Sequence, residues 1–428
     1  MPRRDRFNRA RGRERRRDLP RARRWRISRV GLGYLGVWIA LLAAGLHQQV
    51  NLILLIAGMA AGPVVASIAS ILVSSAMLRS VRVTRRPPDH AFAGGVLILD
   101  YTLENCRQGN AVLALRVEDA LVPVDRAIPG ATSVLPCVTF DRVAPRERFR
   151  LRWQGPTPVR GRYRFASLEL VTGAPFGLME RRLAVPSTDE LVIYPRVGRL
   201  SRRWQQLHRE STQTKKGRRH DRTAQQQEYH GLREYRPGDS PRSIHWRTTA
   251  RVGKPMVKEF EHQNDQDLAI LLDLWLPRMK VVSEQREAIE AALRFAATVC
   301  VEASRQAGRR IVLGWTGPTP GMLSGVASSR LLQEQLQALA IMKPAPEGQV
   351  SGLLDALPPA TLRESLLVLV STRPVNLVEE AERSTRLAGG ASRGLAGRVI
   401  LLDASRGDLD ALIEFDEATR AESPAARR

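Results

Sequence analysis

A short polar block near the middle of the chain carries the residue types that could do chemistry. It covers residues 228–251 and contains histidine, carboxylates and several arginines. Histidine is the side chain that most often serves as a general base, so His245 could take that role, with Asp239 as the carboxylate that orients it. No nucleophile or cluster of metal ligands accompanies this pair in the sequence. We therefore expect no catalytic residue here and interpret the block as a network of structural contacts.

The same block predicts a tight turn followed by an apolar anchor. Pro237 fixes φ and Gly238 can adopt positive φ, which together favour a turn. Ile244 and Trp246 are expected to face inward, while the arginines donate charge-assisted hydrogen bonds to the acidic residues. The candidate interaction residues are Arg233, Glu234, Tyr235, Pro237, Gly238, Asp239, Arg242, Ile244, His245, Trp246 and Arg247.

The block resembles the signature of the DUF58 family, bacterial and archaeal proteins of unknown biochemical function. In that signature an Arg-Glu-Tyr run leads through Pro-Gly-Asp to an isoleucine and a tryptophan, matched here at residues 233–239, Ile244 and Trp246. The family layout is similar over most of the chain: two membrane spans, a β-rich region, the signature and a von Willebrand A-like domain. The resemblance implies a MoxR-type AAA+ ATPase as partner, in complexes thought to assemble or mature other proteins. It supplies no reaction.

Beyond the signature, residues 261–415 alternate strand and helix patterns. Residues 268–273 form a continuous apolar run, which is typical of a buried parallel strand. An amphipathic helix is predicted over residues 283–307. Further strands are predicted at 310–315, 366–370 and 399–402, with helices at 329–342 and 376–387. This alternation predicts an α/β doubly wound domain, with any ligand lying beyond the carboxyl ends of the strands.

Asp273 ends the first strand of this domain. In von Willebrand A-like domains that bind a cation, the corresponding run is Asp-x-Ser-x-Ser, whose hard oxygens suit Mg²⁺. Here Trp275 and Pro277 replace both hydroxyl residues, and neither side chain can coordinate. The resemblance therefore implies a degenerate position at Asp273, and we expect no metal and no cofactor.

The charge of the chain is large but unevenly distributed. Its 428 residues carry a formal net charge of +24, which by itself would suggest a nucleic-acid partner. The excess is concentrated in residues 1–30, 79–86 and 201–260, and residues 31–78 contain no Lys, Arg, Asp or Glu. Basic segments on both sides of a charge-free stretch are a membrane pattern before they are a nucleic-acid pattern.

The charge-free stretch predicts a two-helix transmembrane hairpin over residues 30–78, with a polar turn near residues 47–51. The flanking arginines place both termini in the cytoplasm, so residues 1–29 become an Arg-rich cytoplasmic tail of a protein in the inner, or cytoplasmic, membrane. A signal peptide is the rival interpretation, but the basic region is long and a second span follows at once. Small residues such as Gly58 and Gly62 could bring the spans together or pair two protomers, so a homo-oligomer is one outcome.

Residues 88–195 show short alternating runs separated by Gly and Pro turns, which predict an antiparallel β-sandwich-like module. Residues 196–260 are interpreted as a basic connector that includes the signature, which we expect to lock this module to the α/β domain. Residues 416–428 are expected to be a disordered tail. The three cysteines, Cys106, Cys137 and Cys300, show no CxxC pairing, which fits a reducing compartment.

Three classes of function follow from these features. The favoured prediction is a membrane-anchored, non-enzymatic scaffold or adaptor that works with a MoxR-type ATPase. The alternative is a membrane-tethered protein that binds nucleic acid or anionic lipid through residues 201–260, where Trp204, Tyr229, Tyr235 and Trp246 alternate with basic residues. The α/β domain is mildly acidic, so nucleic acid is not expected as a partner. An enzyme ranks last because no established catalytic motif is present.

Overall fold

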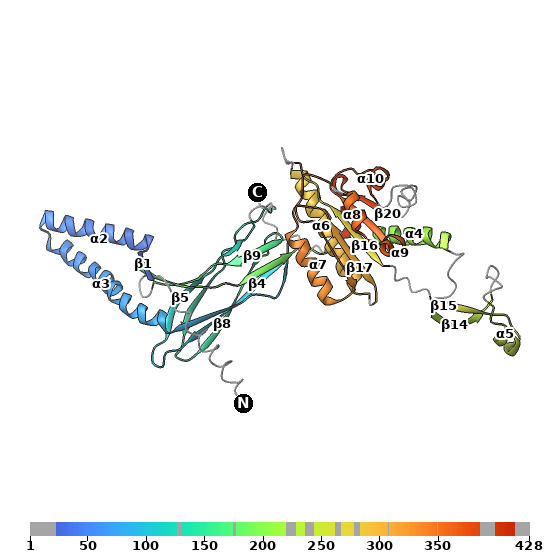
Figure 1. Cartoon of the computed structure of the whole chain (residues 1–428). Coiled ribbons are helices and arrows are strands. Elements are labelled where there is room, and N and C mark those ends of the chain that lie inside the picture. Colours follow the sequence, from blue (N-terminus) through green and yellow to red (C-terminus); the bar gives the residue numbers. More distant parts are fainter. Residues whose placement is uncertain are drawn as a thin grey trace, which may run out of the picture. The chain divides into compact units, whose positions relative to one another are not determined.

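The computed structural model describes residues 23–125, 128, 130–173, 177–219, 228–235, 244–261, 267–277, 283–306, 308–348, 350–385 and 399–415. These residues form two compact units, which divide between Arg196 and Val197 (Figure 1). The tail predicted over residues 416–428 and most of the tail predicted over residues 1–29 lie outside the described residues.

The first unit begins with a helical hairpin. Helix α2 covers Arg29–Gln48 and helix α3 covers Asn51–Arg79, as the apolar pattern predicts. The turn between them includes Gln49 at a φ of 52°. Both helices are long and apolar enough to cross a membrane, over Arg29–Gln48 and Asn51–Ile68, as judged by length and composition.

Two polar side chains tie the hairpin helices together. The Tyr34 hydroxyl donates to the carbonyl of Ala60 at 2.9 Å, and the indole nitrogen of Trp38 donates to the carbonyl of Ala57 at 2.9 Å. Gly58 and Gly62 take no part in this contact, because a Cβ added at either would meet no atom within 4 Å. These glycines therefore do not form the contact between α2 and α3, and their pairing of two protomers stays a prediction.

The hairpin enters the β-rich module without a linker. Met77 and Leu78, in the last turns of α3, are 7% and 3% exposed and belong to the core of the module. Strand β2 (Val81–Arg86) follows directly, so the module begins before the predicted boundary at residue 88. On the other side, the backbone nitrogen of Ser28 donates to the carbonyl of Leu178 at 3.0 Å.

The end of the predicted tail, residues 1–29, contains a β-strand. Strand β1 (Arg23–Ile27) pairs antiparallel with β11 (Met179–Val185) at the edge of a sheet. The sequence gives little sign of this strand because arginines dominate it, and charged residues are tolerated on an edge strand. The predicted division at residue 29 therefore cuts between β1 and α2, which both belong to the first unit.

The module itself is built from three small sheets, with antiparallel pairs throughout except between β3 and β12. One sheet has the order β1-β11-β10-β5-β7, the second β2-β4-β8 and the third β3-β12-β9-β6. The bounds of the remaining strands are β3 (Ala91–Phe92), β4 (Val96–Asn105), β5 (Val112–Glu118), β6 (Leu121–Pro123), β7 (Cys137–Val143), β8 (Arg148–Pro156), β9 (Gly161–Phe165), β10 (Leu168–Thr172) and β12 (Glu190–Tyr194).

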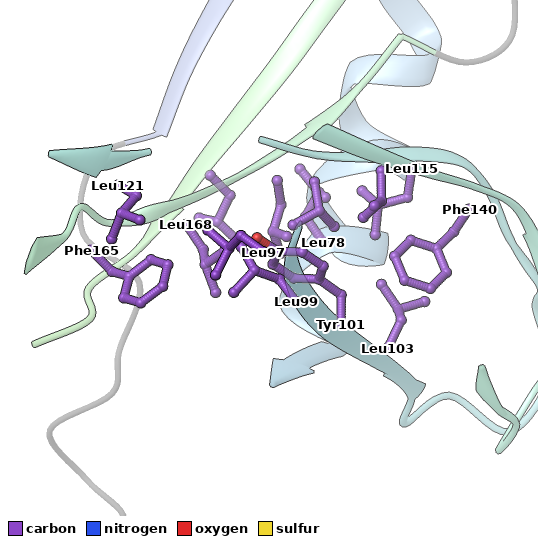
Figure 2. Packing of buried hydrophobic residues seen from close by; sticks show 14 of the residues in the cluster. Leu78, Leu97, Leu99, Tyr101, Leu103, Leu115, Leu121, Phe140, Phe165 and Leu168 are labelled. Carbon is purple, nitrogen blue, oxygen red and sulfur yellow. The ribbon is translucent and has the colours of Figure 1, made fainter. Parts of the chain in front are cut away.

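Strand β4 supplies the centre of the module's core. Leu97, Leu99, Tyr101 and Leu103 alternate along it, and each is at most 1% exposed, as period-two burial requires. Figure 2 shows these side chains gathered with Leu78 and other buried residues of the cluster. The alternation of apolar residues in the sequence of β4 therefore matches the alternation of buried side chains in the structure.

A buried ionic network lies beside this core. The guanidinium of Arg85 donates from Nη1 to both carboxylate oxygens of Asp119, at 3.0 and 2.9 Å, and from Nη2 to Asp189 at 2.6 Å. It also stacks over the Phe165 ring, 3.8 Å from the centroid. The Tyr101 hydroxyl donates to Asp119 at 2.8 Å, and burial together with the Asp119 charge raises the pKa of Tyr101.

Replacing Asp119 should therefore destabilise the first unit strongly. Asp119→Ala leaves the Arg85 guanidinium buried without its main counter-charge, and we expect a loss of about 3–5 kcal/mol. Asp100→Ala is the control, because its pair with Arg152 is partly exposed and should be worth less than about 1 kcal/mol. Urea unfolding read by hydrogen exchange within β4 measures both, and equal losses in the two variants would contradict the assignment.

The second unit contains a five-stranded sheet in the order β18-β17-β16-β19-β20. Strands β16, β17, β19 and β20 are parallel, and β18 joins the edge antiparallel to β17. The four parallel strands confirm the positions predicted from the sequence, whereas β18 was not predicted. The bounds are β16 (Leu268–Asp273), β17 (Arg310–Trp315), β18 (Gly321–Val326), β19 (Leu366–Ser371) and β20 (Val399–Asp403).

Helices cover both faces of this sheet. Ala269 and Leu271 of β16 pack with residues of α8 (Val350–Ala356) and α10 (Leu377–Arg383). The alternate residues of β16 are buried as well, and α6 contacts β16 and β17. The remaining helices are α6 (Ser283–Ser304), α7 (Ser329–Ile341) and α9 (Pro359–Glu364).

The predicted connector is partly anchored in this unit. Strand β13 (Arg199–Leu200) pairs with β21 (Ile413–Glu414), and helix α4 (Arg202–Arg219) follows. Trp204 of α4 is only 4% exposed and packs edge-on against Phe295, with 5.2 Å between ring centroids. The prediction that Trp204 offers a surface for stacking bases is therefore wrong, because an apolar partner on α6 covers the ring.

Candidate functional site

Asp273 lies at the carboxyl end of the central strand and is fully buried. One carboxylate oxygen accepts a hydrogen bond from the hydroxyl of Thr316 at 3.1 Å, just beyond β17. The other accepts from the Ser371 hydroxyl at 3.2 Å, at the end of β19, and from Nε of Arg373 at 3.0 Å. Parallel strands bring these residues to one edge of the sheet, which is where open α/β sheets bind ligands.

The guanidinium of Arg373 supplies the positive charge beside Asp273. Its side chain is 25% exposed, and its Nη2 lies 3.6 Å from the Glu380 carboxylate. Gly348 makes room for it, since a Cβ at that position would overlap the Arg373 guanidinium. Asp273 is thus neutralised by a side chain of the same unit, which the sequence reasoning missed. The available signal was a charged residue two positions after a buried apolar strand, at the same sheet edge as Asp273.

Trp275 forms a hydrogen bond to the loop that contains Ala345 and Pro346, and its side chain has no atom that could coordinate a metal beside Asp273. Its backbone nitrogen donates to the Thr372 hydroxyl at 2.7 Å, and its indole nitrogen donates to the carbonyl of Pro346 at 2.8 Å. It also forms a parallel bridge with Ala345. Within the described ranges, no group of three or more His, Cys, Asp or Glu side chains could hold a metal ion.

A polar pocket of about 430 Å³ opens beside Arg373. Its charged side chains pair with one another along α10: Arg383 bonds to Glu380 at 3.1 Å and reaches Glu379 at 3.8 Å. Glu380 also accepts from the backbone nitrogen of Ser351 at 3.2 Å. The pocket therefore presents balanced charges and no cluster of unpaired groups poised for reaction.

The signature residues that the structure describes form a separate arm. Strand β14 (Glu228–Glu234) pairs antiparallel with β15 (Met256–Glu261), which places Arg233 opposite Val257. Ile244 bridges to Val257, and helix α5 (Trp246–Val252) follows. The hairpin thus brings Glu234 and the 244–247 segment to one end of the arm. Pro237, Gly238, Asp239 and Arg242 lie outside the described residues, as does any contact between His245 and Asp239.

Individual side chains of the arm differ from the predicted network. Trp246 is 67% exposed, so the prediction that it faces inward is wrong. Glu234 pairs with Lys254 at 3.1 Å in an exposed contact. Nδ1 of His245 lies 2.8 Å from the Thr248 hydroxyl, at the start of α5. None of the α5 residues is buried, because the two-stranded arm is too small to cover this short helix.

The Asp273–Arg373 pair can be tested by a double-mutant cycle. Asp273→Ala and Arg373→Met each leave a buried or half-buried charge without its partner, and we expect each to cost about 3–5 kcal/mol. The double variant should recover part of this loss, because neither charge then stays behind. Urea unfolding measured by hydrogen exchange in β16 checks the cycle.

The exposed pair between Arg330 and Glu334 provides the matched control for this cycle. Glu334→Ala should change the unfolding free energy by less than about 1 kcal/mol. Strict additivity of the Asp273→Ala and Arg373→Met losses would show that the two groups do not interact.

Residues 231–419 match the family model described as "Protein of unknown function DUF58", which spans the signature arm and the α/β sheet. The chain also resembles "Uncharacterized protein YeaD" of Bacillus subtilis (strain 168), at 32% identity over 117 residues. That alignment covers 27% of this chain and 28% of the relative, so the chain matches less than a third of the relative's length. The chain is thus similar to DUF58 over less than half of its length, from within the signature arm through the α/β sheet.

Similarities to solved structures are weak. The C-terminal domain of wzt shows 8% identity and a TM-score of 0.20 over 27% of this chain and 73% of that chain. Spo0M, a sporulation control protein from Bacillus subtilis, shows 11% identity and a TM-score of 0.17 over 36% and 58% of the respective chains. TM-scores this low bear on neither fold nor function.

Proposed function

We propose that this DUF58-type chain is a membrane-anchored, non-enzymatic adaptor whose α/β domain is von Willebrand A-like and works with a MoxR-type AAA+ ATPase. The observation that carries the proposal is the Asp273–Arg373 pair at the sheet edge. At this edge the Asp273 carboxylate is already paired with Arg373 of the same unit, so the edge is structurally fixed and Asp273 is not free to react. Such an edge favours a docking role over catalysis.

The hairpin supports the membrane anchor. Large apolar side chains such as Val37, Leu55, Met59 and Val65 are more than 60% exposed on its surface. Soluble monomers rarely expose apolar area on this scale, whereas lipid would cover it. The basic residues that flank the hairpin favour the cytoplasmic membrane with both termini in the cytoplasm.

The sheet topology supports a von Willebrand A-like domain of the doubly wound type. The strand order reverses at β16, because the chain runs outward through β17 and β18 on one side and through β19 and β20 on the other. Asp273 lies at the carboxyl end of β16, at this switch point. In the family resemblance, the same position begins the cation-binding run.

The signature arm is our proposed docking element for the ATPase. Trp246 is 67% exposed, Arg247 beside it is exposed, and Val252 adds further apolar area at 53% exposure. Tryptophan and arginine are the residues most enriched among interface hot spots. A protein partner would bury this exposed tryptophan.

Affinity purification of the full chain from membranes tests the proposed partner. We expect mass spectrometry to identify a AAA+ ATPase with the wild-type chain, and recovery to fall at least about tenfold with Trp246→Ala, since hot-spot truncations cost about 2 kcal/mol or more. Arg330→Ala, a change at a side chain that is 90% exposed on α7, serves as control and should leave recovery unchanged. Stable wild-type chain that recovers no ATPase would contradict the partner, and equal recovery by both variants would contradict the docking element.

A further inference from the structure

One end of the helical hairpin joins the β-module, and we call it the foot of the hairpin. It is the end at which α2 begins and α3 ends. Two loops of the module lie beside it. The backbone nitrogen of Cys106 donates to the carbonyl of Ser80 at 2.9 Å, and that of Arg146 donates to the carbonyl of Arg107 at 3.1 Å. These two loops therefore lie beside the end of α3, whereas the start of α2 is hydrogen-bonded to Leu178.

Exposed or half-buried arginines lie at two places near this end: Arg79, Arg82, Arg107 and Arg146 where α3 meets the module, and Arg26 and Arg29 where β1 meets α2. They come from β1, the start of α2, the end of α3, the start of β2 and the two loops. We call this set the arginine collar, and its members are Arg26, Arg29, Arg79, Arg82, Arg107 and Arg146. All are exposed except Arg107, which is half-buried. No collar side chain forms an ion pair with another residue in the part of the chain that the structure describes.

The nearest carboxylates are already engaged elsewhere. Glu104 lies opposite Arg82 in the β2–β4 ladder, yet it pairs with Arg148 at 3.1 Å. Glu180 lies opposite Arg26, yet it pairs with Arg182 at 3.2 Å and reaches Arg116 at 3.4 Å. The carboxylate of Glu147 accepts from the backbone nitrogen of Ala144 at 2.6 Å. The collar charge is thus not neutralised by the module.

We propose that the arginine collar binds the phosphate headgroups of anionic phospholipids. The inference rests on the membrane anchor proposed above, because a hairpin that spans the bilayer places its foot at the headgroup level. Guanidinium groups match phosphate in a bidentate geometry, which makes arginine suited to this contact. Lipid phosphate supplies the counter-charge that no carboxylate of the module provides. The direct connection between α3 and β2 keeps the collar arginines close to the headgroups.

Lipid selection by the full chain in nanodiscs tests the proposal. The nanodiscs contain equal parts phosphatidylcholine and phosphatidylglycerol, and native mass spectrometry counts the lipids that stay bound. We expect the wild type to retain phosphatidylglycerol preferentially, by roughly fivefold for each collar arginine that meets a headgroup. Added salt should weaken the preference. The variant Arg82→Gln, Arg107→Gln and Arg146→Gln should lose at least about tenfold of it.

Two matched variants separate lipid binding from loss of fold. Arg86→Gln, Arg162→Gln and Arg164→Gln remove three exposed arginines, one from the end of β2 that is farther from α3 and two from β9, and should keep the wild-type preference. Lysine at the three collar positions keeps the charge and should keep most of the preference. Retention of full preference by the collar glutamine variant overturns the proposal, as does a wild type without preference.

A separate experiment tests whether the hairpin anchors the chain in a membrane. Release of the chain from vesicles of either lipid by alkaline carbonate would refute the anchor itself and the collar proposal with it. A chain that resists carbonate but shows no preference for phosphatidylglycerol refutes the collar alone. Binding of soluble polyglutamate in place of phosphatidylglycerol would assign the collar to an acidic protein and overturn the lipid proposal.

Discussion

Each unit is organised around a carboxylate that has been removed from water and is neutralised by an arginine distant in sequence. In the first unit Asp119 meets Arg85, 34 residues away, and both side chains are at most 1% exposed. In the second unit Asp273 meets Arg373, 100 residues away. A buried carboxylate without a partner is costly, so both units depend on bringing these segments together.

The two pairs have different consequences for function. The Arg85 pair lies inside the β-module, where it joins Asp119 to Asp189 and Tyr101 and fixes the packing of one end. The Arg373 pair lies at a sheet edge that would otherwise be open to a ligand. There the Arg373 guanidinium supplies the counter-charge to Asp273 from within the unit.

The sequence predicted the features that depend on local pattern. The apolar runs identified the hairpin helices and the parallel strands, and alternation identified β4, because burial period follows backbone geometry. It failed where a side chain's environment is decided by distant residues. Trp204 is covered by Phe295, Trp246 lies exposed on a small arm, and Arg373 reaches Asp273 across the sheet. Strand β1 was hidden because its pairing partner, and not its own composition, makes it a strand.

The continuous join between α3 and β2 has a mechanical consequence. Met77 and Leu78 are at once the last turns of a helix and part of the core of the β-module. A change in the tilt of α3 relative to the module would therefore disturb the packing of this core. If the hairpin spans a membrane as proposed, a force on α3 would act on the β-module through this direct join.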